Sequence, residues 1–228
     1  MKLMTSVALT CFSLILATPL HAQLSFRFVQ STQNIENIDD TIAVLAGSNV
    51  AFETNSTAPM FDLVDGDSFF SSRFSLDLNL LGQPGVAEDD FAIEVDASVE
   101  ITTPGTYTFG MAIDDGGRFQ IDTGNGFVTL MERTTGGAAQ EFYGDVELQT
   151  PGKYPIKLIY WDAVGQANVE VYSAMGTFTQ FDSSMRLLGD TANGGLMLSN
   201  STERGDINCD GQINFLDISP FIQLLANP

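Results

Sequence analysis

Histidine and cysteine are almost absent from this chain of 228 residues, which has one histidine and two cysteines. The histidine, His21, and one cysteine, Cys11, both fall within the first 22 residues. If that segment is removed, no side chain remains for a Ser-His-Asp triad, an imidazole zinc site or histidine acid–base catalysis. Cys209 then has no partner within the chain, which excludes an internal disulfide.

The first 22 residues have the pattern of an export signal. Lys2 supplies a basic start, Val7 to Ala17 forms an apolar run too short to span a bilayer, and Ala22 offers a small residue before a cleavage point. We therefore interpret residues 1–22 as a signal peptide. We expect the remainder to be an exported, extracellular or cell-surface protein without membrane insertion.

Positive charge is also scarce. The chain has 9 lysine and arginine residues against 29 aspartate and glutamate residues, for a formal charge of −20. A field of that sign repels nucleic acid and anionic membranes, so we expect neither as a partner. It suits divalent cations and a salty medium, in which self-repulsion is screened.

Long helical patterns are missing, and short stretches with alternating apolar and polar residues take their place. Predicted strands lie near residues 74–80, 91–101, 107–113, 119–121, 127–131, 142–148, 154–161 and 167–173. One short helix is predicted from Ile38 to Ala46, with Asn37 as its N-cap and Gly47 as its stop. The pattern predicts an all-β fold, an antiparallel β-sandwich with one short helix.

We divide the exported part into three pieces. Residues 23–189 are predicted to form the sandwich, residues 190–204 a small polar linker, and residues 205–228 a calcium-loop and helix module. Within the linker, Leu196 to Leu198 could instead be a last strand. The terminal helix carries apolar residues on one side, and because the module buries little apolar surface it should depend on the sandwich, a partner or calcium for its order.

The terminal module begins with twelve residues, DINCDGQINFLD, whose oxygen-bearing side chains have the spacing of a calcium-binding loop. Gly211 stands at the sixth position, where the loop turns sharply. The alternative is an acidic turn before a helix. The predicted ligands are Asp206, Asn208, Asp210, Gln212 through its carbonyl, Asn214 and Asp217.

The short aspartate at the last loop position, together with the sequence GDIN and the following helix, resembles one repeat of a type I dockerin. That resemblance implies a protein docking partner. A dockerin has two such repeats, and this chain has one.

Two further stretches stand out in the sandwich. The run from Pro104 to Asp122 places Asp114 and Asp115 between a predicted strand and two glycines, and the run from Pro151 to Tyr172 carries the loop YWDAVGQ. Together they resemble the protective-antigen-type (PA-fourteen) domain, in its adhesin and lectin branch, most firmly from Asp90 to Ala174. This resemblance implies a β-sandwich.

The resemblance also implies a calcium site. An aspartate pair joined by a cis peptide, here Asp114 and Asp115, grips the ion, which also holds sugar hydroxyls. Asp162 takes the place of an asparagine ligand, and the carbonyls of Val164 and Gln166 complete the set. Calcium takes six to eight oxygens, so a protein that supplies about five leaves positions for a sugar.

Alternatives remain for these residues. Asp-Asp-Gly-Gly is good turn chemistry by itself, so a solvated turn is the alternative for Asp114 and Asp115. Trp161, the only tryptophan, could stack on a sugar as a ligand-binding residue or could fill the core at a strand end.

These features favour a secreted, calcium-dependent carbohydrate-binding or adhesion module that is not an enzyme and has a glycan or cell-surface polysaccharide as its partner. One alternative is a non-catalytic interaction or scaffold protein that docks through its terminal module. The other is a polysaccharide-degrading enzyme or its accessory subunit, for which Glu132, Glu141 and Glu147 are the candidate acids.

Overall fold

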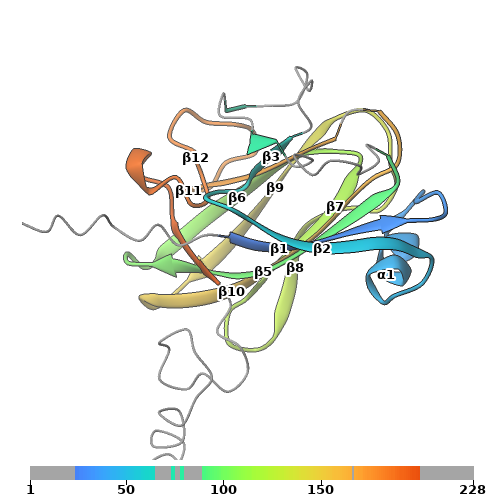
Figure 1. Cartoon of the computed structure of the whole chain (residues 1–228). Coiled ribbons are helices and arrows are strands. Elements are labelled where there is room, and N and C mark those ends of the chain that lie inside the picture. The colour runs from blue at the N-terminus through green and yellow to red at the C-terminus, as the bar shows by residue number, and fades with distance from the viewer. Residues whose placement is uncertain (1–23, 65–72, 75–77, 80–88, 166, 201–228) are drawn as a thin grey trace, which may run out of the picture.

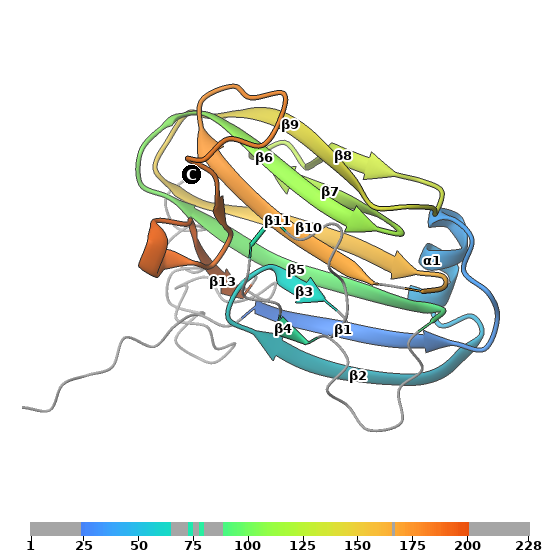
Figure 2. The same cartoon turned by 90° about the horizontal axis from the view of Figure 1, so that it is seen from above.

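A computed structural model describes residues 24–64, 73–74, 78–79, 89–165 and 167–200 of the chain. Two almost entirely antiparallel sheets lie face to face, with one short helix at an end of the stack (Figures 1 and 2). The predicted all-β sandwich is confirmed. The predicted signal peptide and the predicted terminal calcium loop lie outside the described residues.

The larger sheet has seven strands, six of them in the order β2-β1-β5-β10-β7-β8. The seventh, β13, pairs with the part of β5 that follows the residues paired with β1. The long central strands of this sheet, β5 and β10, pair over eleven consecutive residues. The strands are β1 (Leu24–Ser31), β2 (Val50–Ala58), β5 (Phe91–Ile101), β7 (Gly116–Asp122), β8 (Phe127–Arg133), β10 (Gly152–Asp162) and β13 (Met197–Asn200).

The smaller sheet has six strands in the order β4-β3-β11-β6-β9, with β12 paired to β11. Its centre is the pair β6 and β11, and the short pair β3 and β4 is parallel. The strands are β3 (Asp62–Val64), β4 (Leu78–Asn79), β6 (Gly105–Asp114), β9 (Gln140–Leu148), β11 (Asn168–Met175) and β12 (Arg186–Leu187).

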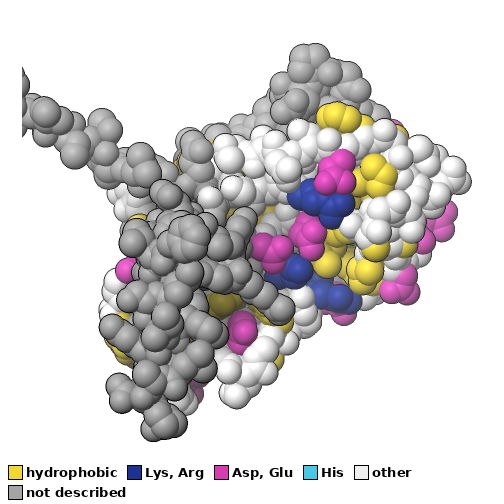
Figure 3. Space-filling view, turned by 60° about the horizontal axis from the view of Figure 1, so that its bottom comes forward, with side chains coloured by type: hydrophobic (Ala, Val, Ile, Leu, Met, Phe, Trp, Pro, Cys, Tyr) yellow, Lys and Arg dark blue, Asp and Glu magenta, His cyan; other side chains and the backbone are white. Residues whose placement is uncertain are grey.

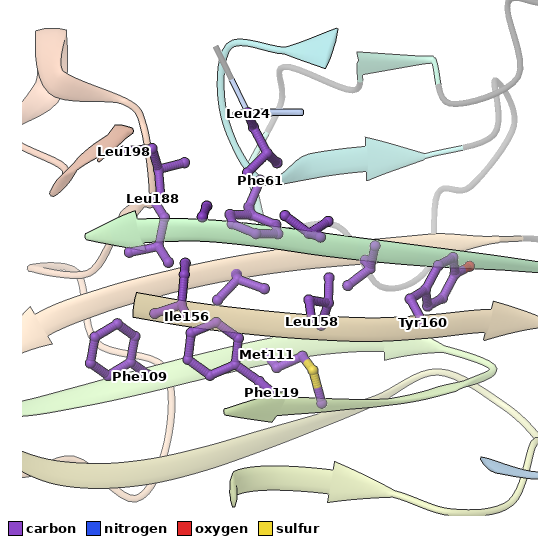
Figure 4. Packing of buried hydrophobic residues seen from close by; sticks show 14 of the residues in the cluster. Leu24, Phe61, Phe109, Met111, Phe119, Ile156, Leu158, Tyr160, Leu188 and Leu198 are labelled. Atoms are coloured by element: carbon purple, nitrogen blue, oxygen red, sulfur yellow. The ribbon is translucent and has the colours of Figure 1, made fainter. Parts of the chain in front are cut away.

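The inward side chains of the two sheets form one apolar core, shown in Figure 4. Phe109 of the smaller sheet meets Phe119 of the larger sheet with ring centroids 5.5 Å apart. Phe28 and Phe91 stack within the larger sheet at 5.0 Å. Because alternate residues of a strand face opposite sides, the period-two pattern in the sequence identifies these core residues.

The outer face of the larger sheet is covered by paired charges instead. Arg27 contacts Glu53 and Glu94, Lys157 contacts Glu94 and Asp96, and Arg118 contacts Glu132. Figure 3 shows a face on which basic and acidic side chains lie side by side. These five contacts use three of the nine basic residues of the chain.

The helix α1 (Ile38–Leu45) confirms the helix predicted from the sequence. The side chain of Asn37 accepts hydrogen bonds from the backbone N–H groups of Asp39 and Asp40, at 2.9 and 3.0 Å. Gly47 follows the helix with a φ of 97°, in the left-handed region where glycine costs least. The helix packs against Trp161 and its neighbours in a second apolar cluster. Within the described residues, no helix has the length and apolar character that a membrane span needs.

Replacing Asn37 with alanine should destabilise the protein by about 1 kcal/mol, because two helix N–H groups lose their acceptor. Equilibrium urea unfolding measures the change. Asn125→Ala, at an exposed turn between β7 and β8, is the control and should change stability by less than about 0.5 kcal/mol. An equal effect of both substitutions would contradict the capping role.

Two parts of the sequence interpretation need correction. No strand was assigned before residue 74, yet β1 and β2 pair over most of their length, and β1 joins β5.

The span 190–200 is not a linker, because β13 pairs with β5 and Leu198 is buried in the core. Strand β13 has only four residues, too few to show an alternating pattern, so the alternative of a last strand is the correct one. Of the strand predicted near 74–80, the described residues are Phe74, which lies in a bend, and β4.

Candidate functional site

The topology brings three connections to one end of the sandwich. The corner between β6 and β7 contains Asp114 and Asp115, residues 134–139 connect β8 to β9, and residues 163–167 connect β10 to β11. Helix α1 lies at the same end, where β10 finishes (Figure 2). The N–H of Ile38 donates to the carbonyl of Thr134 at 3.0 Å, which joins the helix to the second connection.

The peptide bond between Asp114 and Asp115 is cis, the geometry that the resemblance implies. Asp115 is only 6% exposed. Its Oδ1 accepts from the N–H of Gly137 at 2.7 Å, and its Oδ2 accepts from the N–H of Ala163 at 2.8 Å. Asp115 is therefore a buried carboxylate that holds both neighbouring loops, and it does not belong to a solvated turn.

Asp114 is half-buried beside it. The hydroxyl of Tyr160 donates to the Asp114 carbonyl at 2.6 Å and fixes the backbone of the pair. Across the β6–β11 ladder, Asp114 lies opposite Asn168. Asn168 is fully buried, and neither its Oδ1 nor its Nδ2 has a hydrogen-bond partner among the described residues. The sequence analysis missed Asn168, because only the strand register places it next to the aspartate pair.

The loop after β10 is held from two sides. Besides the bond from Ala163 to Asp115, the N–H of Gly165 donates to Asp89 Oδ1 at 2.9 Å. Val164 projects outward and is 70% exposed, whereas Asp162 at the base of the loop is fully buried. Gln166 lies outside the described residues. These contacts fix the course of the loop beside Asp115.

The described residues contain no group of three or more acidic, histidine or cysteine side chains arranged to hold a metal ion. Asp114, Asp115 and Asp162 thus do not form a three-carboxylate group. A cation at this end would need the aspartate pair, neutral oxygens such as backbone carbonyls, and oxygens of a ligand or water.

Trp161 is fully buried in the apolar cluster under α1, with Val29, Ile38 and Ala92 among its neighbours. A Cβ atom at Gly116 would lie 2.2 Å from its ring, so the indole covers this glycine closely. A buried ring has no face free for a sugar. Trp161 is therefore a core residue, and its predicted role in ligand stacking is wrong for this structure.

The three candidate catalytic glutamates do not lie close to one another. Glu132 pairs with Arg118 on the outer face of the larger sheet, and Glu141 pairs with Arg73 on the outer face of the smaller sheet. The hydrogen bond from Arg73 holds the pKa of Glu141 below its ordinary value, the opposite of what a general acid needs. Glu147 shares a strand with Glu141, but six residues span about 20 Å, well beyond a glycosidase pair.

Comparison with known proteins gives one family. A sequence model described as the PA14 domain matches residues 75–178. No curated protein matches the chain.

Solved structures share the fold at low sequence identity. The PA14 domain of the antifreeze protein MpAFP has a TM-score of 0.53 at 16% identity, over 77% of this chain and 89% of that one. The A domain of epithelial adhesin 9 from Candida glabrata, solved with Galβ1-3GlcNAc, has a TM-score of 0.54 at 13% identity, over 78% and 89%. An anti-sigma factor domain-containing protein has a TM-score of 0.51 at 19% identity, over 73% of this chain and 46% of that one. The family model thus matches somewhat less than half of the chain, and the solved structures share the β-sandwich fold of the described residues.

Proposed function

We propose that this protein is an exported, calcium-dependent carbohydrate-binding module whose ligand site is the end of the sandwich at Asp114 and Asp115. The observation that carries the proposal is the position of Asp115, which is buried yet bonded to both neighbouring loops. A carboxylate held in this way is preorganised, so an ion bound there would keep a fixed geometry. The adhesin domain solved with Galβ1-3GlcNAc lends support through its shared fold.

The donor chemistry fits calcium. Each carboxylate oxygen of Asp115 has two lone pairs and uses one for a backbone N–H, so it keeps capacity for a metal. Asp114 adds a second carboxylate, and the carbonyls of Val164 and Gln166 are the proposed neutral ligands. Asp162 adds negative charge at the base of the same loop. Hydroxyls of a sugar would complete a coordination shell of six to eight oxygens.

A glycan array tests this function. The exported form, lacking residues 1–22, should bind a defined set of glycans in calcium and none in excess chelator. Binding that persists in chelator would remove the bridging ion from the proposal. An array without any bound glycan in calcium would remove the carbohydrate function itself.

The second candidate function is protein docking through residues 205–228, favoured by the six ligand positions and the glycine of the terminal loop. We propose that this loop binds one calcium ion, since its three aspartates repel each other without a cation. A non-catalytic scaffold protein, with the sandwich as its spacer, would use this module alone. A polysaccharide-degrading role loses support from the placement of its candidate glutamates.

Hydrogen exchange checks the terminal loop. Amides of residues 205–226 should become protected when calcium is added to the metal-free protein, because the ion orders the loop and its helix. Asp217→Ala, which removes the last ligand, should suppress that protection while leaving exchange in β5 and β10 unchanged. Equal protection with and without calcium in the unmodified protein would show that the segment is only an acidic turn.

A further inference from the structure

Arg133, the last residue of β8, is a buried arginine with no ion-pair partner among the described residues. It is 8% exposed, and its Nη1 atom is buried with no hydrogen-bond acceptor. No ion pair within the described part of the chain involves this side chain. A buried charge without a partner is costly, so its presence requires an explanation.

The other arginines of the described residues are all satisfied. Arg27, Arg73 and Arg118 pair with glutamates, as noted above. Arg186 donates to backbone carbonyls, including that of Ser183 at 2.7 Å. Arg133 therefore differs from its counterparts in this fold, and the difference occurs at the end that carries the candidate site.

The surroundings of Arg133 connect it to Asp115. The next residues, Thr134 to Ala138, are exposed and form the loop whose Gly137 N–H bonds to Asp115. A Cβ at Gly136 would lie 2.9 Å from Asp115 Oδ1, and a Cβ at Gly137 would lie 3.1 Å from Arg133 Nη2. Two residues without side chains thus separate the carboxylate from the guanidinium. The backbone of these glycines lies so close to both groups that a side chain at either position would contact the carboxylate or the guanidinium.

Strand alternation explains why Arg133 points inward. Met131, two residues earlier, faces the core, and Glu132 between them pairs with Arg118 outside. The guanidinium consequently lies on the inner side of the sheet beside Gly137, away from the paired charges of the outer face.

We propose that Arg133 binds the carboxylate of an acidic sugar, so that the preferred ligands of this site are glycans containing uronic acid. The inference rests on the proposed function, because the hydroxyls of the same sugar would be held by calcium at Asp114 and Asp115. A guanidinium matches a carboxylate with two parallel hydrogen bonds, which fits a planar group better than a point charge. Asp115 is not that partner in this structure, because no ion pair joins it to Arg133 among the described residues and its two oxygens accept from Gly137 and Ala163.

The test compares two oligosaccharides of identical linkage, one ending in glucuronate and the other in glucose, by calorimetry in calcium. The unmodified protein should bind the glucuronate form at least about tenfold more tightly than the glucose form, because a charge-assisted hydrogen bond to a largely buried guanidinium is strong. Arg133→Gln should remove this preference and leave glucose-form affinity within about threefold. Arg118→Gln is the matched control, because it removes the same charge from the same hairpin and should keep the preference.

A second measurement separates this inference from the proposed function. Sodium glucuronate is titrated into the protein in chelator, and the amide resonances of Gly136 and Gly137 are followed. They should shift in the unmodified protein and in Arg118→Gln, but not in Arg133→Gln. Calcium-dependent binding of the glucose form without any preference for glucuronate would overturn the inference and leave the proposed function standing. If these amide resonances do not shift in the unmodified protein, the inference fails, whether or not any glycan binds.

The stability of the variant gives a last check. Removal of an unpaired buried charge should not destabilise the fold, so Arg133→Gln should melt at or above the temperature of the unmodified protein. A marked loss of stability would show that Arg133 is a structural residue with a partner in the folded state, and the inference would fail.

Discussion

Replacing Asp115 with alanine is expected to abolish calcium-dependent glycan binding, lowering affinity at least about a hundredfold, while Asp217→Ala leaves it unchanged. The first substitution removes a charged ligand from an ion that must itself hold the sugar, so metal and sugar affinity should fall together. The second lies in the terminal module, beyond the last described strand, where coupling to the sandwich should be weak. Calorimetry with calcium and with a bound glycan measures both effects.

Asp115 also supports the fold, and the experiment must separate the two roles. Its oxygens accept from Gly137 and Ala163, so alanine leaves two N–H groups near the protein interior without their acceptor. Asp115→Asn keeps the size and one carbonyl acceptor but removes the negative charge. Circular dichroism should show both variants folded, and Asp115→Asn should still lose most calcium affinity. If a folded Asp115→Asn binds calcium and glycan like the unmodified protein, the lectin assignment fails and the docking role becomes the better one.

Most of the strands and the helix could be predicted from the sequence, because the residue patterns that determine them span only a few positions. Alternation along β5, β6 and β10 marks the inward side chains of both sheets, and Asn37 with Gly47 marks the ends of α1. These signals operate within a few residues, where the pleat of a strand or the unpaired N–H groups of a helix determine the preferred residue type. The missed β2 carries mostly exposed residues at a sheet edge, so it has little apolar alternation.

The site was predictable only in part, because its contacts depend on register. Asp114 and Asp115 are adjacent in sequence and stand out before two glycines. Asn168 is 54 positions from Asp114 and reaches it only through the β6–β11 pairing. Arg133 occupies an ordinary position at a strand end, and its lack of a partner becomes visible only when the neighbouring elements are in place. A single sequence holds no local signal for either residue.

Replacing Trp161 with alanine should destabilise the protein by about 3 to 5 kcal/mol, as expected for a fully buried aromatic side chain. The indole is fully buried between Gly116 and the cluster under α1, so its loss leaves a cavity below the helix. Trp161→Phe fills part of that space and should cost less. Urea unfolding measures both changes, and glycan affinity is measured on whichever variant remains folded.

The two possible roles of Trp161 predict opposite effects of substitution on stability and on glycan affinity. For a core residue, stability falls in the order tryptophan, phenylalanine, alanine, while folded Trp161→Phe binds glycan within about threefold of the unmodified protein. For a stacking residue, stability would change little and affinity would fall, since stacking requires an exposed face that the buried ring does not have. Loss of glycan binding in a Trp161→Phe variant of unchanged stability would therefore show that the ring reaches the ligand. The core placement would then be wrong for the bound state.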